Sequence, residues 1–257
     1  MTSSSPAAVK AALAPKGVLH VGLNLSNFLL IAPHPAGNDY RGVAPDLARE
    51  LGQRLGVPVI FVPYDVPGKM ADAVDSGAWD IAFFAIEPLR AAVVDFSAAY
   101  LEIESTYLVP AGSPLQTIAD VDQPGVRISV MNRSAYELYL TRHLQHAQLV
   151  HAPSIEASFQ QFVDQKLDVL SGLRPRLVMD AAKLPGSRIL DGRFTAVQQA
   201  IGTPRTDKSG AGGGSHAGGS AGAAYLRAFV EEAKASGLVA ALIERNGVKG
   251  VNVAPAA

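Results

Sequence analysis

Short apolar runs alternate along the chain with segments in which apolar residues recur every three or four positions. The runs have the length of strands, and the recurring spacing is typical of one face of a surface helix. This alternation predicts βαβ units around mostly parallel sheets, so the expected fold class is α/β. The runs that predict strands are 18–23, 59–62, 80–85, 126–130, 149–151, 168–171 and 196–202.

Helices are predicted between these strands, at 45–55, 134–144 and 155–163 and from about residue 223. In the third of them, Ile155, Phe159, Phe162 and Val163 fall on one face and predict a buried apolar stripe. Gly56 is expected to end the first helix, since glycine adopts the left-handed conformation of a helix C-terminus.

The strands and helices form two series, and the second series begins after Pro110. The spacer 209–222 is nearly all Gly, Ser and Ala, a composition that predicts a flexible linker. It contains chance matches to a nucleophile elbow and to a dinucleotide-binding loop, but neither has the strand and helix context that such a motif needs.

Charge and composition narrow the range of partners. The chain has 22 Lys and Arg against 23 Asp and Glu, so it lacks the basic surface expected for nucleic-acid binding. It contains no Cys and no apolar run near the roughly 20 residues of a membrane span. No apolar signal stretch stands in 1–16, so we expect either a mature exported form or a chain that is never exported.

Arg90 is the first candidate for ligand binding. It follows the strand 80–85 closely, and open α/β sheets bind ligands at the carboxyl ends of their strands. Its planar guanidinium matches the geometry of a carboxylate. The alternative is a surface arginine paired with Glu87 or Asp95.

Ser134 is the second candidate, because it opens a helix directly after the strand 126–130. The free N–H groups and the dipole of a helix N-terminus attract anions. A simple helix cap is the competing interpretation.

Three histidines close together in the sequence, His143, His146 and His151, raise the question of a metal site. No carboxylate is arranged among them and no HExxH motif occurs. We therefore expect no metal and no cofactor.

Four segments together resemble a known family: 40–48, 77–82, 87–100 and 118–121. The most specific has the pattern Arg-x4-Asp-Phe-Ser-x-x-Tyr and begins at Arg90. The pattern resembles the family 3, amino-acid-type, periplasmic solute-binding proteins of ABC importers. The resemblance implies the type II fold, in which two lobes joined by two crossing strands close around a ligand by hinge motion. Lobe 1 would then comprise 1–108 and 200–257, and lobe 2 would comprise 109–199.

The resemblance also implies the site residues. Arg90 would hold the ligand carboxylate, and the turn of Arg133, Ser134 and Ala135 would bind the same group from the second lobe. The other positions implied for ligand contact, through backbone or side chain, are Asn24, Asn27, Phe28, Ala85 and Ile86.

The sequence departs from the family where amino-acid binders carry an Asp for the ligand ammonium, because Leu173 and Arg174 stand there. Glu87 or Asp65 would have to replace it. Otherwise the ligand is an acid without an amine, and Arg174 would serve as a second cation.

Three functions remain open. The leading hypothesis is a monomeric periplasmic binding protein that captures a carboxylate-bearing metabolite for an ABC permease. The second is a dehydratase of the cyclohexadienyl type on the same fold, with Glu87 as general acid. The third is a cytoplasmic sensor that is not exported.

Overall fold

The computed structural model describes residues 5–35, 37, 39–205 and 221–257. Its contacts divide the chain into two compact units, of which unit 1 comprises Met1–Leu101, Gln198–Val248 and Val253–Ala257. Unit 2 comprises Glu102–Val197 and Lys249–Asn252. The chain changes unit at 101/102 and 197/198, and again at 248/249 and 252/253, whereas the sequence suggested 108/109 and 199/200.

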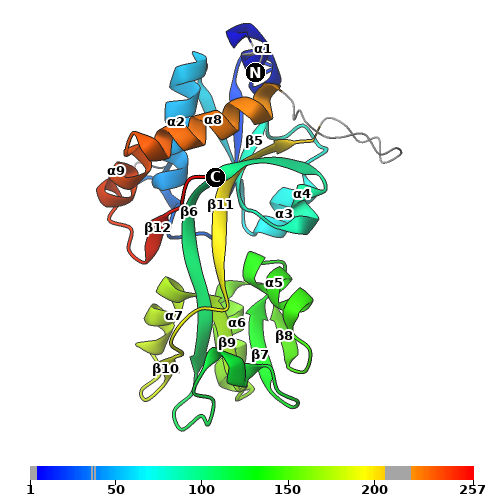
Figure 1. Ribbon diagram of the computed structural model, residues 1–257, viewed down its shortest axis with the longest axis vertical. Helices are drawn as coiled ribbons and strands as arrows, with labels where there is room; N and C mark the ends of the chain where they lie inside the picture. The colour runs from blue at the N-terminus through cyan, green and yellow to red at the C-terminus, as the bar shows by residue number, and fades with distance from the viewer. Residues whose placement is uncertain (1–4, 36, 38, 206–220) are drawn as a thin grey trace. The chain divides into compact units, whose positions relative to one another are not determined.

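Unit 1 contains a sheet flanked by helices (Figure 1). Strand β1 lies parallel to both β4 and β5, and β11 pairs antiparallel to β5. The elements within unit 1 are α1 (Pro6–Leu13), β1 (Leu19–Asn24), β2 (Ala32–Pro33), β3 (Tyr40–Arg41), α2 (Val43–Leu55), β4 (Val59–Tyr64), α3 (Pro67–Asp72), β5 (Ile81–Ala85), α4 (Pro88–Ala91), α8 (Ala221–Ala235) and α9 (Leu238–Arg245).

In unit 2, β7 lies parallel to β8 and β9, while β6 pairs antiparallel to β9. Its elements are η1 (Ile118–Val121), β7 (Arg127–Met131), α5 (Ala135–His143), β8 (Gln148–Ala152), α6 (Ile155–Asp164), β9 (Val169–Leu173), α7 (Arg174–Ala181) and β10 (Arg188–Ile189). Three further strands cross a unit boundary: β6 (Val94–Val109), β11 (Thr195–Pro204) and β12 (Val251–Val253).

Each predicted strand and helix is present, with ends shifted by a few residues, and the α/β class is confirmed. Gly56 ends α2 in the left-handed conformation with φ of 64°, as predicted. The stripe on α6 is right for Phe162, which is 3 % exposed, but wrong for Val163, which is 38 % exposed. Ser158 is buried on α6 instead, and its carbonyl accepts a hydrogen bond from Ser129.

The sequence pattern did not predict α1. This helix packs against α8, as Figure 1 shows at one end of unit 1. Its buried side chains are Val9 and Leu13, and Leu13 comes so close to Gly222 that a Cβ there would lie 2.7 Å from it. Most of the predicted spacer, 209–220, lies outside the described residues, while Ala221 and Gly222 belong to α8.

Glycine at position 42 allows the chain to enter α2. Its φ is 125°, and an added Cβ would lie 2.2 Å from the carbonyl oxygen of Leu30. That oxygen also accepts a hydrogen bond from the N–H of Ala44. The segment before β2 is therefore held directly against the first turn of α2.

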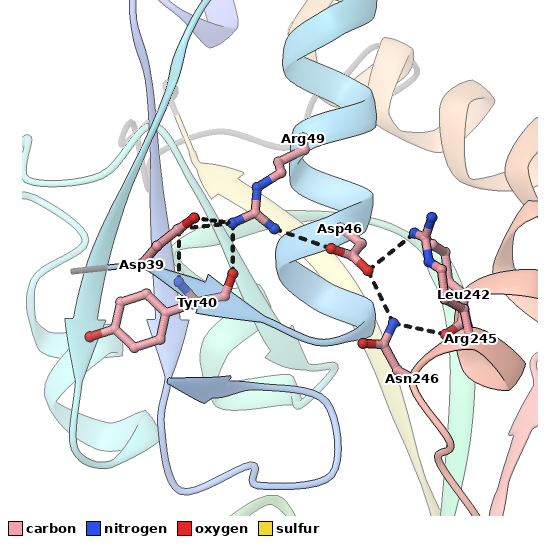
Figure 2. A network of polar contacts seen from close by, with 7 residues as sticks. All are labelled: Asp39, Tyr40, Asp46, Arg49, Leu242, Arg245 and Asn246. Atoms are coloured by element: carbon pink, nitrogen blue, oxygen red, sulfur yellow. Dashed lines mark hydrogen bonds and ion pairs between the residues drawn. The ribbon is translucent and has the colours of Figure 1, made fainter. Parts of the chain in front are cut away.

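A network of charged and polar side chains also connects this region to helices α2 and α9 (Figure 2). Arg49 on α2 donates to Asp39 at 2.8 Å and to Asp46 at 3.1 Å. The other carboxylate oxygen of Asp46 accepts from Arg245 and Asn246, at 3.1 and 3.0 Å. The network thus joins the hairpin of β2 and β3, helix α2 and the end of α9 within unit 1.

No helix in the described part of the chain is long and apolar enough to cross a membrane.

Two helix ends allow a matched test of backbone strain. Lys166, beyond the end of α6, has φ of 47°, a region that favours glycine. We expect Lys166→Gly to raise the free energy of unfolding by about 0.5 kcal/mol, since relief of strain outweighs the added freedom of the unfolded chain. Gly56→Ala should lower it by about 1 kcal/mol. Urea unfolding measures both, and shifts of the same sign would contradict the interpretation.

Candidate functional site

Arg90 lies buried at the carboxyl end of β5. All residues of β5 are buried, and the chain turns through Ile86 and Glu87 into the short helix α4. The side chain of Arg90 donates to the carbonyl of Ala85 at 3.0 Å, and its guanidinium lies 5.7 Å from the centre of the Phe84 ring. Only 5 % of the residue is exposed. These contacts hold the guanidinium in place. They also offset the cost of its burial, since a charge removed from water requires polar or aromatic partners.

The surface position of the alternative interpretation does not hold for Arg90, while its pairing with Glu87 stays open. The residue is buried, and Asp95 forms an ion pair with Arg205 at 3.1 Å. Glu87 is 6 % exposed, so a buried carboxylate stands three positions before the buried guanidinium.

Part of the backbone near Arg90 is already engaged within unit 1. The Ala85 carbonyl accepts from Arg90, and the Ile86 N–H donates to the Gln198 carbonyl at 2.8 Å. Ligand binding by Ala85 and Ile86 stays a prediction, and it would have to use backbone groups other than these two.

The segment after β1 lies at the same edge of the unit 1 sheet. Because β1 and β5 are parallel, with Val21 opposite Ile81, their carboxyl ends lead to one edge. Asn24 accepts from the hydroxyl of Ser26 at 2.7 Å and forms a local turn. The structure therefore places Asn24, Asn27 and Phe28 at the edge that carries Arg90.

Asn27 differs from its neighbours in having an unsatisfied acceptor. It is 8 % exposed, and its side-chain oxygen is buried without a hydrogen-bond partner in the described part of the chain. A buried acceptor without a partner costs free energy, so a ligand N–H or O–H would be favoured beside it. Phe28 is 36 % exposed and offers an apolar surface at the same edge.

Unit 2 carries the second set of predicted residues, at the end of β7. Ser134 is the N-cap of α5 and accepts from the N–H of Glu137 at 3.1 Å, so the capping interpretation is correct. Arg133 before it is exposed and has φ of 57°. Ala135 is the first residue of α5, where N–H groups lack partners within the helix.

Sequence reasoning missed Glu137. Its carboxylate accepts from the N–H of Arg133 at 3.0 Å, the hydroxyl of Thr141 at 2.8 Å and the imidazole of His151 at 3.1 Å. The residue is 5 % exposed. A buried anion thus already stands at the N-terminus of α5 and orders the turn at Arg133. The Ser-x-x-Glu pattern of a capping box at 134–137 is the signal that would have found it.

Arg174 begins α7 directly after β9 and is engaged within unit 2. It donates to Glu104 at 2.7 Å and also to the carbonyl of Gly192. Arg193 lies 3.7 Å from the same carboxylate. As a second cation for the ligand, Arg174 would have to share its charge with Glu104.

Two of the three histidines have side-chain partners, and these partners differ. His143 stacks on Tyr139 with ring centres 3.8 Å apart, and His151 contacts Glu137. Within the described ranges, no group of three His, Asp or Glu side chains is arranged to hold a metal.

The comparisons with known proteins establish the family. A model described as bacterial extracellular solute-binding proteins, family 3, matches residues 31–248. The chain belongs to this family, which confirms the resemblance found in the sequence.

Solved structures show the same fold. The ancestral amino acid-binding protein AncCDT-1, described as a precursor of cyclohexadienyl dehydratase, is 23 % identical with a TM-score of 0.69, over 91 % of this chain and 96 % of that one. A putative binding component of an ABC transporter from Wolinella succinogenes, complexed with lysine, is 22 % identical with a TM-score of 0.71, over 90 % and 95 %. AbpA from Streptococcus pneumoniae, bound to L-arginine, is 21 % identical with a TM-score of 0.70, over 91 % and 96 %. The two-lobed type II periplasmic binding fold is thereby confirmed.

One curated relative is an enzyme. Cyclohexadienyl dehydratase from Pseudomonas aeruginosa is 32 % identical over 135 residues, which are 51 % of this chain. The match spans about half the length of that enzyme, 50 %.

Tyr136 gives the α5 region a dependence on alkaline pH. Burial raises the pKa of Tyr136 to about 12, and a hydrogen bond with Ser134 opposes this shift. Because the folded pKa lies above the unfolded value of 10.0, this contribution to stability is complete below pH 10 and is lost between pH 10 and pH 12. In Tyr136→Phe the free energy of unfolding should fall less steeply with rising pH over this window. The slope should differ from that of the wild type by up to about 1.4 kcal/mol per pH unit.

Urea unfolding across that window measures the effect, and the matched control is Ser154→Ala, which removes the side chain that caps α6 at the N–H of Ala157. This substitution should cost about 1 kcal/mol at pH values on both sides of the window. Equal slopes for the wild type and Tyr136→Phe would contradict the assignment.

Proposed function

We propose that the chain binds a small carboxylate-bearing metabolite, an amino acid or a related organic acid, for uptake through an ABC-transporter permease. The observation that carries the proposal is the buried guanidinium of Arg90 at the carboxyl end of β5. It has a fixed orientation before any ligand arrives, which reduces the entropy cost of binding. The solved relatives complexed with lysine and arginine support this class of ligand.

The remaining contacts follow from the two sets of residues. On unit 1, Asn27 supplies a buried acceptor and Phe28 an apolar surface, with Asn24 shaping the turn. On unit 2, the candidate for anion binding is the turn from Arg133 to Ala135, and the neighbouring Glu137 holds the shape of this turn. We further propose a periplasmic location and a monomeric state.

The missing aspartate bears on the choice of ligand. Of the two replacement anions, Asp65 is paired with Lys69 at 2.8 Å and its side chain is 77 % exposed. Glu87 is buried and close in sequence to Arg90. An amino acid would therefore place its ammonium near Glu87 and Asn27, whereas an acid without an amine would need no such anion.

A thermal-shift screen of amino acids, dicarboxylates and keto acids tests the proposal. A ligand at a hundred times its Kd should stabilise the fold by about 2.7 kcal/mol. Arg90→Gln should weaken binding of the hit by more than about tenfold, because a charge-assisted hydrogen bond contributes about 1.5–3 kcal/mol. Arg90→Lys should give an intermediate affinity, since the ammonium keeps the charge but lacks the planar fork.

The matched control is Arg49→Gln, also in unit 1, whose guanidinium is paired with Asp39 and Asp46. It should lower stability without changing ligand affinity. A hit that binds Arg90→Gln and the wild type equally would exclude Arg90 as the anchor.

A second candidate function is dehydration, favoured by the relationship to cyclohexadienyl dehydratase. Glu87 would act as general acid beside Arg90, which would grip the substrate carboxylate. Prephenate and arogenate are the substrates to test. Turnover that Glu87→Gln reduces by about 100-fold or more would support the enzyme, and prephenate binding without turnover would exclude it.

A further inference from the structure

Unit 2 contains a groove of about 790 Å³ that the proposed function does not use. Its walls come from the loop after β6, the turn before β7, the end of α6 and the loop after α7. Val126 and Asp168, which line it, precede the parallel strands β7 and β9. The groove therefore lies at the amino ends of these strands, whereas Ser134 and Arg174 follow their carboxyl ends.

Long arginine side chains hold two of these walls in place. Arg188 donates to the carbonyl of Ser113 at 3.0 Å, within the loop after β6. Arg127 donates to the carbonyl of Lys166 at 2.8 Å, beyond the end of α6. Because these carbonyls are fixed by contacts within unit 2, the groove is formed without a ligand.

The lining is mainly apolar. Among the lining residues, Phe162 and Leu167 are buried, with 3 % and 2 % exposed, while Leu115 and Leu184 are half-buried. Val163 turns to the groove side of α6 and is 38 % exposed. Pockets of about 300–1,000 Å³ with apolar walls and few polar groups are typical small-molecule sites.

One cation in this lining lacks a counter-charge. Asp168 is engaged by Arg127, through the N–H at 2.8 Å and the guanidinium at 3.4 Å. Lys166 is exposed, and in the ranges that the structure describes no carboxylate pairs with its ammonium. Lys166 also occupies a left-handed position, with φ of 47°, where glycine would be less strained.

We propose that this groove binds an amphipathic organic anion, a molecule with an apolar acyl or aryl body and one carboxylate. The apolar body would pack on Phe162, Val163 and Leu115, and the carboxylate would pair with the ammonium of Lys166. The site shares no residue with the Arg90 site, so it stands independently of the function proposed above.

Titration calorimetry of the full chain with sodium decanoate tests the proposal, with decanol as the neutral probe of equal chain length. Decanoate should bind with one site per chain, and more tightly than decanol. Lys166→Gly, which also relaxes the backbone, should weaken decanoate about fivefold and leave decanol unchanged, because an exposed ion pair contributes up to about 1 kcal/mol. Lys166→Arg should keep the affinity.

Val163→Glu and Val178→Glu form a matched pair of exposed positions in unit 2. Val163 lines the groove, whereas Val178 on α7 is 54 % exposed and lies outside it. Val163→Glu should weaken decanoate by more than about tenfold, because it places a like charge and a polar group in the apolar wall. Val178→Glu and Arg90→Gln should bind decanoate as the wild type does.

Three results would overturn the proposal. These are no binding of decanoate, equal affinity in the wild type and Val163→Glu, or loss of binding in Arg90→Gln. The last would assign decanoate to the Arg90 site, which separates failure of this inference from failure of the proposed function.

Discussion

The parallel pairing of β1 with β5 is the constraint on which the candidate site of unit 1 depends. The two strands approach closely because Gly22 has no side chain, and a Cβ there would lie 2.9 Å from that of Ala82. Their carboxyl ends meet at one sheet edge, which brings the segment after Asn24 to the segment that ends at Arg90. Residues far apart in the chain, which we propose as ligand contacts, thereby lie at one edge of the sheet.

Each unit contains a buried charged side chain that forms hydrogen bonds within the same unit. In unit 1 the Arg90 guanidinium donates to the Ala85 carbonyl and lies over the Phe84 ring. In unit 2 the Glu137 carboxylate accepts three hydrogen bonds, one of them from the backbone of Arg133. Such charges are ordered before a ligand binds, so binding does not have to supply the cost of ordering them. This is the behaviour expected of a protein that selects its ligand by buried polar contacts.

The family match and the residues of the candidate site support different conclusions about function. The family match covers most of the chain and defines a solute-binding protein. The related dehydratase shows that a sequence similar to half of this chain occurs in an enzyme. The two functions proposed above assign different roles to a carboxylate near Arg90, and Glu87 is a buried carboxylate three positions before it.

The sequence by itself determined many of the strands and helices, although not α1, as well as the left-handed end of α2 at Gly56 and the position of Arg90 after a strand, because these depend on local spacing and backbone preference. Only the tertiary structure decided which partners the charges take. Arg174 pairs with Glu104, 70 positions away, and Val163 faces a groove instead of the core. Periodicity reports which face of an element is apolar, but the partners of a side chain depend on how distant elements pack.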